Sequence, residues 1–202
     1  NGCHIILKIS KSTKMGDDLY GLTDKGKCRE KKEDTFVARE IINNQFLVGG
    51  GIDGVGGYQG VDVAAGIARS VIMKTLEELS ENVIEGLRQA IIAANDKINE
   101  EKKEAGINER MACVLTCVVA DINNNKCLYA HVGDKRIYLL RDHSLVKISK
   151  DHSVVGFLEE SGRLSEEEAM RHPRRNEINK ALGFEEDISI PEDFIETGES
   201  PF

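Results

Sequence analysis

Apolar and polar positions follow different periods in successive parts of this chain of 202 residues. Near the start, short apolar runs are separated by polar stretches rich in charged and turn-forming residues. The runs cover residues 5–9, 20–23, 35–37 and 45–48. Short apolar runs bounded by such residues are typical of β-strands, so the first part of the chain predicts strands at these places.

The middle of the chain switches to the spacing of an α-helix. Apolar residues recur three or four positions apart in two successive runs. The first comprises Ala64, Ala68, Val71, Ile72, Leu76 and Leu79, and the second comprises Val83, Ile84, Leu87, Ile91, Ala94 and Ile98. The second run predicts a helix over about residues 83–105, which would be roughly 34 Å long at 1.5 Å per residue.

Strand-like patterning returns after the two helices. Apolar runs at residues 111–121, 127–132, 136–140 and 145–148 are separated by turn residues at 123–125, 133–134 and 142–143. This pattern predicts an antiparallel meander of hairpins. From residue 154 the chain is charged and helical, with breaks at Gly162 and Pro173.

The order of these elements predicts an α+β fold in which helices pack on antiparallel sheets. No proline-rich linker or internal repeat divides the sequence. We therefore expect a single domain over residues 1–202. A chain of this length can bury roughly 70% of its unfolded surface, so it needs no disulfide or zinc to fold.

Composition narrows the partners and the cellular compartment that we expect for the protein. A formal net charge of −8 argues against a nucleic-acid partner. The five cysteines form no CxxC pair, and Cys113 and Cys117 lie in an apolar run, which predicts buried thiols in a reducing compartment. No segment reaches about 18 consecutive apolar residues, so we expect no membrane span. A cytoplasmic protein is the resulting expectation.

The strongest candidate for chemistry is a glycine-rich segment around one carboxylate, Asp53. Residues 49–60 contain seven glycines. Glycine tolerates positive φ and close backbone approach but costs conformational entropy on folding. So many glycines predict a turn that presents Asp53 to a metal ion or a phosphate.

A dinucleotide-binding turn is the competing interpretation of this segment. Gly49, Gly51 and Gly54 form a GxGxxG pattern that follows a strand and precedes a helix. However, the glycines end before the helical pattern begins, and the downstream sequence is a β-meander rather than alternating βαβ units. Both observations disfavour a dinucleotide fold.

Three further segments carry side chains suited to metal or phosphate chemistry. Glu33 and Asp34 precede a predicted strand, and adjacent carboxylates suit Mg²⁺ or Mn²⁺ although they are more often solvated surface. Arg29 would offer the planar fork that matches a phosphate. Asp134 follows Gly133 at a predicted turn, where turn chemistry is the usual role of an acid.

Two residues near these segments have structural interpretations. His131 lies on a predicted strand, where a lone histidine is more often structural than a ligand. Asp151, in the run Lys150-Asp151-His152-Ser153, is too close in sequence to its neighbours for triad geometry, so we interpret it as a helix cap or turn former.

Taken together, the order of these segments resembles the PPM-type metal-dependent serine/threonine phosphatases (the protein phosphatase 2C family) in their bacterial form. Residues 26–34 resemble the family's G-x-x-R-x-x-N-E-D, with Lys32 in place of Asn. Residues 53–57 resemble D-G-M/H-G-G, with Val55 in the variable position. Residues 133–136 resemble G-D-S-R, with Lys135 in place of Ser, and residues 150–153 resemble T-x-D-H-S. The resemblance runs from about residue 20 to residue 183.

The resemblance implies an antiparallel β-sandwich flanked by helices in α-β-β-α layers, and two Mg²⁺ or Mn²⁺ ions that activate a water for attack on phosphorus. By position, Asp53 would bridge both ions and Gly54 would offer its carbonyl oxygen. Glu33 would hold one ion, and Asp134 would help to bind a third. Asp34 would orient metal-bound water, and Arg29 would bind the substrate phosphate.

The sequence also departs from the family pattern. The family has two later aspartates, in an S-D-G-L strand and a D-N pair, and this chain stops before both, which suggests C-terminal truncation. We therefore expect a phosphoprotein phosphatase-like domain with weak or lost activity. The alternative is a catalytically inactive pseudophosphatase that binds a regulatory protein partner. Missing strands would expose a sheet edge, for which a homodimer is one cover.

Overall fold

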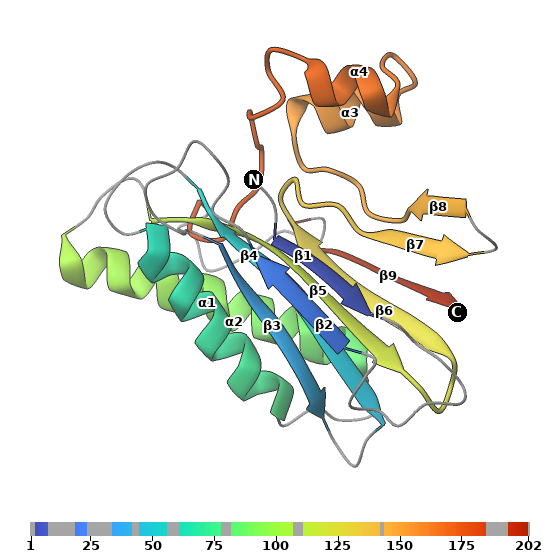
Figure 1. Ribbon diagram of the computed structural model, residues 1–202. Coiled ribbons are helices and arrows are strands. Elements are labelled where there is room, and N and C mark those ends of the chain that lie inside the picture. The colour runs from blue at the N-terminus through green and yellow to red at the C-terminus, as the bar shows by residue number, and fades with distance from the viewer. Residues whose placement is uncertain are drawn as a thin grey trace.

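Strands and helices account for most of the chain that the computed structural model describes, which comprises residues 3–7, 19–23, 34–41, 45–55, 61–77, 82–106, 111–141, 144–184 and 194–201 (Figure 1). In chain order the elements are β1 (Cys3–Leu7), β2 (Leu19–Thr23), β3 (Asp34–Ile41), β4 (Phe46–Gly54), α1 (Val61–Glu77), α2 (Val83–Ala105), β5 (Cys113–Asp121), β6 (Lys126–Val132), β7 (Tyr138–Arg141), β8 (Ser144–Lys147), α3 (Val154–Glu160), α4 (Glu166–Arg171) and β9 (Glu196–Pro201). The predicted α+β class is confirmed.

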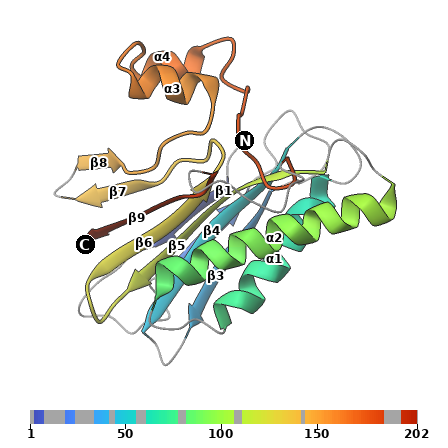
Figure 2. The same cartoon turned by 180° about the vertical axis from the view of Figure 1, so that it is seen from behind.

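The centre of the fold is a five-stranded antiparallel sheet in the order β3-β4-β5-β6-β9. Helices α1 and α2 run side by side across one of its faces, as Figure 2 shows from behind. Alternate strand residues point into the layer between them, among them Ile52 of β4 and Leu115 of β5, which are almost fully buried. The predicted packing of the two long helices on a sheet is therefore confirmed.

Local capping explains where α2 begins and ends. The side chain of Asn82 accepts a hydrogen bond of 3.2 Å from the backbone N–H of Glu85. At the other end, Gly106 adopts φ +64°, the left-handed conformation that closes many helices. The resulting helix, Val83–Ala105, has the bounds that the apolar spacing predicts.

Two smaller antiparallel pairs accompany the five-stranded sheet. Strands β1 and β2 pair with each other, and the pair contacts β3 and β4. Strands β7 and β8 form the second pair, which lies near α3 and α4 and away from α1 and α2 (Figure 1). Helices and an antiparallel sheet are present as expected, while a complete β-sandwich remains a prediction.

The glycine-rich segment is a strand up to Gly54, which corrects the prediction of a turn. Gly49, Gly50 and Gly51 lie inside β4, paired with β3 on one side and β5 on the other. No residue of β4 has a positive φ. A Cβ on Gly50 would lie 2.7 Å from the backbone oxygen of Thr116. Close packing of neighbouring strands is therefore what requires glycine, and a dinucleotide-binding turn at these residues is wrong.

The predicted meander is interrupted after β6. Strand β5 pairs with β6, and β7 pairs with β8, but β6 has β9 rather than β7 as its other neighbour. The chain leaves the sheet at Gly133, whose φ of +115° is rarely accessible to other residues. This exit places the turn that follows β6 at the end of the sheet.

Candidate metal centre

Asp53 lies near the end of β4, next to the buried Ile52 and on the opposite face of the sheet from α1 and α2. Its carboxylate Oδ2 is 2.5 Å from Nζ of Lys135, on the turn after β6. The two side chains are 16% and 21% exposed, so the ion pair is largely shielded from water. The fold thus brings a carboxylate of β4 and a cation of a distant turn together.

Asp134 adds a second carboxylate to this region. Burial raises the pKa of the Asp134 carboxyl, and the negative charge of Asp53 acts in the same direction, whereas Lys135 opposes both. Like charges raise each other's pKa only when they lie close together. The turn after β6 therefore places Asp134 within electrostatic reach of Asp53.

Steric fit and backbone hydrogen bonds fix the turn that carries Asp134. A Cβ on Gly133 would lie 2.3 Å from a side-chain atom of Val114, so only glycine fits there. The Gly133 N–H donates to Nδ1 of His152 at 3.1 Å, and the His152 N–H donates to the Gly133 oxygen at 2.7 Å. These contacts fix the position from which Asp134 and Lys135 extend.

His131 supports the same turn from inside the sheet. Its Nε2 is 2.8 Å from the Gly133 oxygen, and its Nδ1 is 2.9 Å from Oγ1 of Thr116. Because a carbonyl only accepts, Nε2 carries the proton and Nδ1 accepts from the threonine hydroxyl. Burial lowers the pKa of His131 to about 3, and the charge of His152 adds to the effect. The predicted structural role of this histidine agrees with these contacts.

Arg136, the residue after Lys135, is the centre of a partly buried ionic cluster. Its guanidinium contacts Asp151 at 2.7 Å, Glu159 at 3.0 Å and Glu166 at 2.8 Å. The interpretation of Asp151 as a helix cap is therefore wrong. Ser153 caps α3 instead, with its hydroxyl accepting from the backbone N–H of Gly156 at 3.0 Å.

The cluster joins the β7–β8 hairpin to the helices that follow it. Tyr138 donates to Glu166, and Lys147 pairs with Glu159. Burial raises the pKa of Asp151, while its hydrogen bond to Arg136 opposes that effect. Each cluster carboxylate is thus partnered within the hairpin and the helices, which indicates a structural role.

The structure describes the predicted site residues to different extents. Arg29 and Glu33 lie outside the described residues. The backbone of Asp34 lies directly opposite that of Asp53 in the β3–β4 register. Gly54 ends β4 opposite Cys113. Among the described side chains, no three His, Cys, Asp or Glu residues are grouped to hold a metal ion.

Sequence reasoning noted Lys135 and His131 but missed their partners. The turn at residues 123–125 fixes the register of the β5–β6 hairpin, so the pairing of Thr116 with His131 follows by counting from it. The pairing of Lys135 with Asp53 has no such local signal, because the 81 residues 54–134 lie between them in the sequence. Only the folded sheet brings them together.

Comparison with known proteins places the chain in a family. The model of the family described as protein phosphatase 2C matches residues 19–184. The chain belongs to the protein phosphatase 2C family. The serine/threonine phosphatase stp of Listeria monocytogenes is 32% identical over 174 residues, which cover 83% of this chain and 68% of stp.

Solved structures of phosphatases have the same fold. Stp1 from Staphylococcus aureus has a TM-score of 0.75 at 26% identity, covering all of this chain and 75% of its own. The catalytic domain of PstP, solved in complex with 2 manganese ions, has a TM-score of 0.69 at 26% identity, covering 88% of this chain and 69% of its own. Protein phosphatase 2C enzymes use Mn²⁺ or Mg²⁺, and the family acts on phosphoproteins.

The donors around Asp53 fit such an ion. Mn²⁺ and Mg²⁺ are hard cations that prefer carboxylate, carbonyl and water oxygens. Asp53 and Asp134 supply two partly shielded carboxylates at one end of the sheet, and Lys135, the cation described beside Asp53, carries a single charge. Their shared negative charge is the property that a divalent ion neutralises.

Buried cysteines do not contribute to this site. Burial raises the pKa of Cys117 to about 12 and that of Cys127 to about 11, so both stay protonated at neutral pH. Cys113 is buried as well, and its pKa is also raised. The prediction of buried thiols at Cys113 and Cys117 is confirmed, and none of the three is suited to nucleophilic attack.

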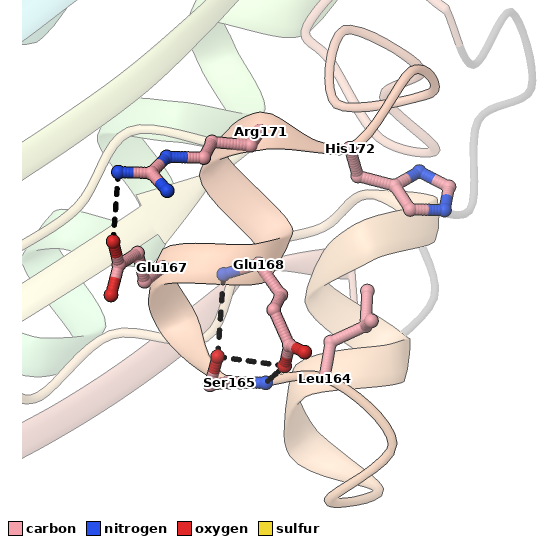
Figure 3. Close-up of a pocket in the computed structure, with 6 residues that line it drawn as sticks. All are labelled: Leu164, Ser165, Glu167, Glu168, Arg171 and His172. Carbon is pink, nitrogen blue, oxygen red and sulfur yellow. Dashed lines mark hydrogen bonds and ion pairs between the residues drawn. The ribbon is translucent and has the colours of Figure 1, made fainter.

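A surface depression at α4 offers a second place for a ligand. Leu164, Ser165, Glu167, Glu168, Arg171 and His172 line it (Figure 3). Ser165 and Glu168 form a capping box, and Arg171 pairs with Glu167 one helical turn away. These polar groups serve the helix itself, so the Asp53 region remains the candidate site.

None of the helices in the described parts of the chain is long and apolar enough to cross a bilayer.

Proposed function

We propose that this chain is a Mn²⁺- or Mg²⁺-dependent serine/threonine phosphoprotein phosphatase domain centred on Asp53. The observation that carries the proposal is the meeting of Asp53 with the Asp134 turn at the end of the sheet. Family membership makes phosphate ester hydrolysis the chemistry to expect of these carboxylates. Stp, the Listeria relative, is itself named a serine/threonine phosphatase.

The groups that would hold the metal ions are the carboxylates of Asp53, Asp134 and Glu33 and the carbonyl of Gly54. When bound, such ions lower the pKa of water and neutralise charge on a phosphoryl group. Asp34, opposite Asp53 in the register, would orient the attacking water. Arg29 would bind the substrate phosphate through its guanidinium fork.

Three further properties of the protein remain predictions. They are a single domain over residues 1–202, a cytoplasmic location, and a homodimer that covers a sheet edge. Light scattering of the purified chain tests the dimer, since a mass near twice 22.4 kDa supports it and a mass near 22.4 kDa contradicts it.

The test of the proposed function is hydrolysis of para-nitrophenyl phosphate with and without Mn²⁺. Wild-type turnover should need Mn²⁺ and disappear with a chelator, and Asp53→Asn should lower it about 100-fold or more. Lys126→Ser is the matched control, since Lys126 pairs with Glu199 on an exposed surface. Turnover that is indifferent to Mn²⁺ and to Asp53→Asn would contradict the proposal.

A catalytically inactive binding domain is the second candidate function. The ion pair of Lys135 with Asp53 favours it, because a cation of the chain already neutralises the central carboxylate. This candidate predicts no turnover at any Mn²⁺ concentration, together with retained binding of a phosphoprotein or regulatory partner. Mn²⁺-dependent turnover by the purified chain would rule it out.

A further inference from the structure

The ammonium of Lys135 forms an ion pair with Asp53, the carboxylate that the proposed function assigns to a metal ion. Its Nζ lies 2.5 Å from Asp53 Oδ2. We propose that Lys135 is a built-in cation that competes with divalent metal ions for Asp53 and so sets the metal concentration at which the site fills. This inference rests on the proposed function, because it concerns the same carboxylate.

The attachment of Lys135 favours its access to Asp53 over that of any ion in solution. Lys135 extends from the turn that Gly133 and His152 hold in place, so its ammonium is tethered close to β4. Tethering raises the effective concentration of a group at its target, up to the millimolar range. A metal ion must therefore displace a cation that cannot diffuse away.

The neighbouring arginine cannot take over this role. Arg136 is engaged by Asp151, Glu159 and Glu166, and its side chain is 14% exposed. Among the described residues, the salt bridge that the structure gives to Lys135 is the one with Asp53. Arg136 is thus held in the cluster, while Lys135 has a single ion pair to exchange when a metal ion arrives.

Partial shielding sets the size of the expected effect. Exposed ion pairs contribute little, whereas breaking buried ones is costly, and the exposures of 21% and 16% place this pair between the two. A divalent ion would also repel the ammonium at close range. We expect removal of the Lys135 charge to tighten Mn²⁺ binding by about tenfold, between the effects of exposed and buried pairs.

Calorimetric titration with Mn²⁺ alone tests this competition. Lys135→Gln removes the charge at similar length, Lys135→Arg keeps a cation, and Lys126→Ser is the surface control. We expect tighter binding for Lys135→Gln by about tenfold, and affinities near wild type for the other two. Equal affinity of Lys135→Gln and wild type, with binding abolished by Asp53→Asn, would overturn the inference while leaving the metal site standing.

Acylation of lysines, read by mass spectrometry, supplies a second measurement that does not depend on activity. Lys135 should react slowly without metal, faster with saturating Mn²⁺, and faster in Asp53→Asn without metal. Lys126 should react alike in all three samples. Lys135 reactivity unchanged by Mn²⁺ would overturn the inference. Failure of the proposed function is distinguishable, because wild type, Lys135→Gln and Asp53→Asn would then all lack a Mn²⁺ site.

Discussion

Lys135 and Arg136 are adjacent cations with contrasting surroundings. Arg136 contacts three carboxylates that come from α3, α4 and the segment before them. Lys135 turns the other way and pairs with Asp53 at the end of β4. Two consecutive residues therefore belong to different sites: Lys135 to the candidate metal centre and Arg136 to a structural cluster.

The comparison shows how the number of contacts made by a cation distinguishes a structural cluster from a candidate metal site. In the Arg136 cluster, Arg136 and Lys147 face three carboxylates, and Arg136 contacts all three of them directly. Around Asp53, the described residues place one lysine beside two carboxylates, and the charge of Asp53 raises the pKa of Asp134. An excess of partly shielded negative charge is what a metal ion relieves.

Removing the charge of Arg136 should have the largest effect on stability. Arg136→Met leaves Asp151 and Glu159 shielded and without this cation, and breaking such a pair costs about 3–5 kcal/mol. Lys135→Met should cost about 1 kcal/mol or less, as for more exposed pairs. Urea unfolding monitored by circular dichroism measures both, and equal losses would remove the contrast between the two cations.

Asp53 and Asp134 should differ in their effect on Mn²⁺-dependent turnover. Asp53→Asn should lower kcat/KM about 100-fold or more, the upper range found when support of a metal site is lost. Asp134→Asn should lower it by about tenfold, the lower end of the same range. Phosphatase assays across Mn²⁺ concentrations provide the comparison, and a larger loss for Asp134→Asn would reverse the assigned roles.

His131 should lower the free energy of unfolding as the pH falls below 6.5. The unfolded chain binds a proton at this residue near pH 6.5, whereas the folded chain resists it down to about 3. Below pH 6.5 the unfolded state thus holds more protons, and stability falls by about 1.4 kcal/mol per pH unit. Between pH 7 and pH 5.5 this residue should lower the stability of wild type by about 1.2 kcal/mol in urea unfolding, and the loss should be smaller in His131→Asn. Identical slopes would contradict a buried, neutral His131.

Substitutions at two glycines should change stability with opposite signs. Gly50→Ala places a Cβ against the backbone of β5, and such overpacking costs about 1–3 kcal/mol. Gly66 lies on α1, where a Cβ would meet nothing within 4 Å. Gly66→Ala should therefore stabilise the fold by about 0.5–1 kcal/mol. Thermal unfolding distinguishes them, and a stabilising Gly50→Ala would contradict the close approach of β4 and β5.

Periodicity predicted the elements more reliably than their connections. The apolar spacing from Val83 onward predicts α2, because one buried stripe along a helix leaves a local signal. The pairing of β6 with β9 had no local signal, since the contact joins segments about 70 residues apart. The glycine content of residues 49–54 predicts a turn wrongly, because composition does not distinguish positive φ from close strand packing.

The candidate site was predictable in its residue types but not in its charge balance. Asp53 and Asp134 carry the motifs of the family, so their positions followed from resemblance. The ion pair of Lys135 with Asp53 depends on where the chain leaves the sheet at Gly133, which is a property of the whole fold. The lysine at position 135 therefore affects the site through a contact that the sequence alone does not predict.

The most direct test of the account is a crystal structure of the chain soaked in Mn²⁺, with manganese located by its anomalous scattering. The account predicts a manganese peak at the Asp53 carboxylate, with the Lys135 ammonium moved away from it. An intact ion pair between Lys135 and Asp53 at saturating Mn²⁺, with no manganese at Asp53, would contradict it.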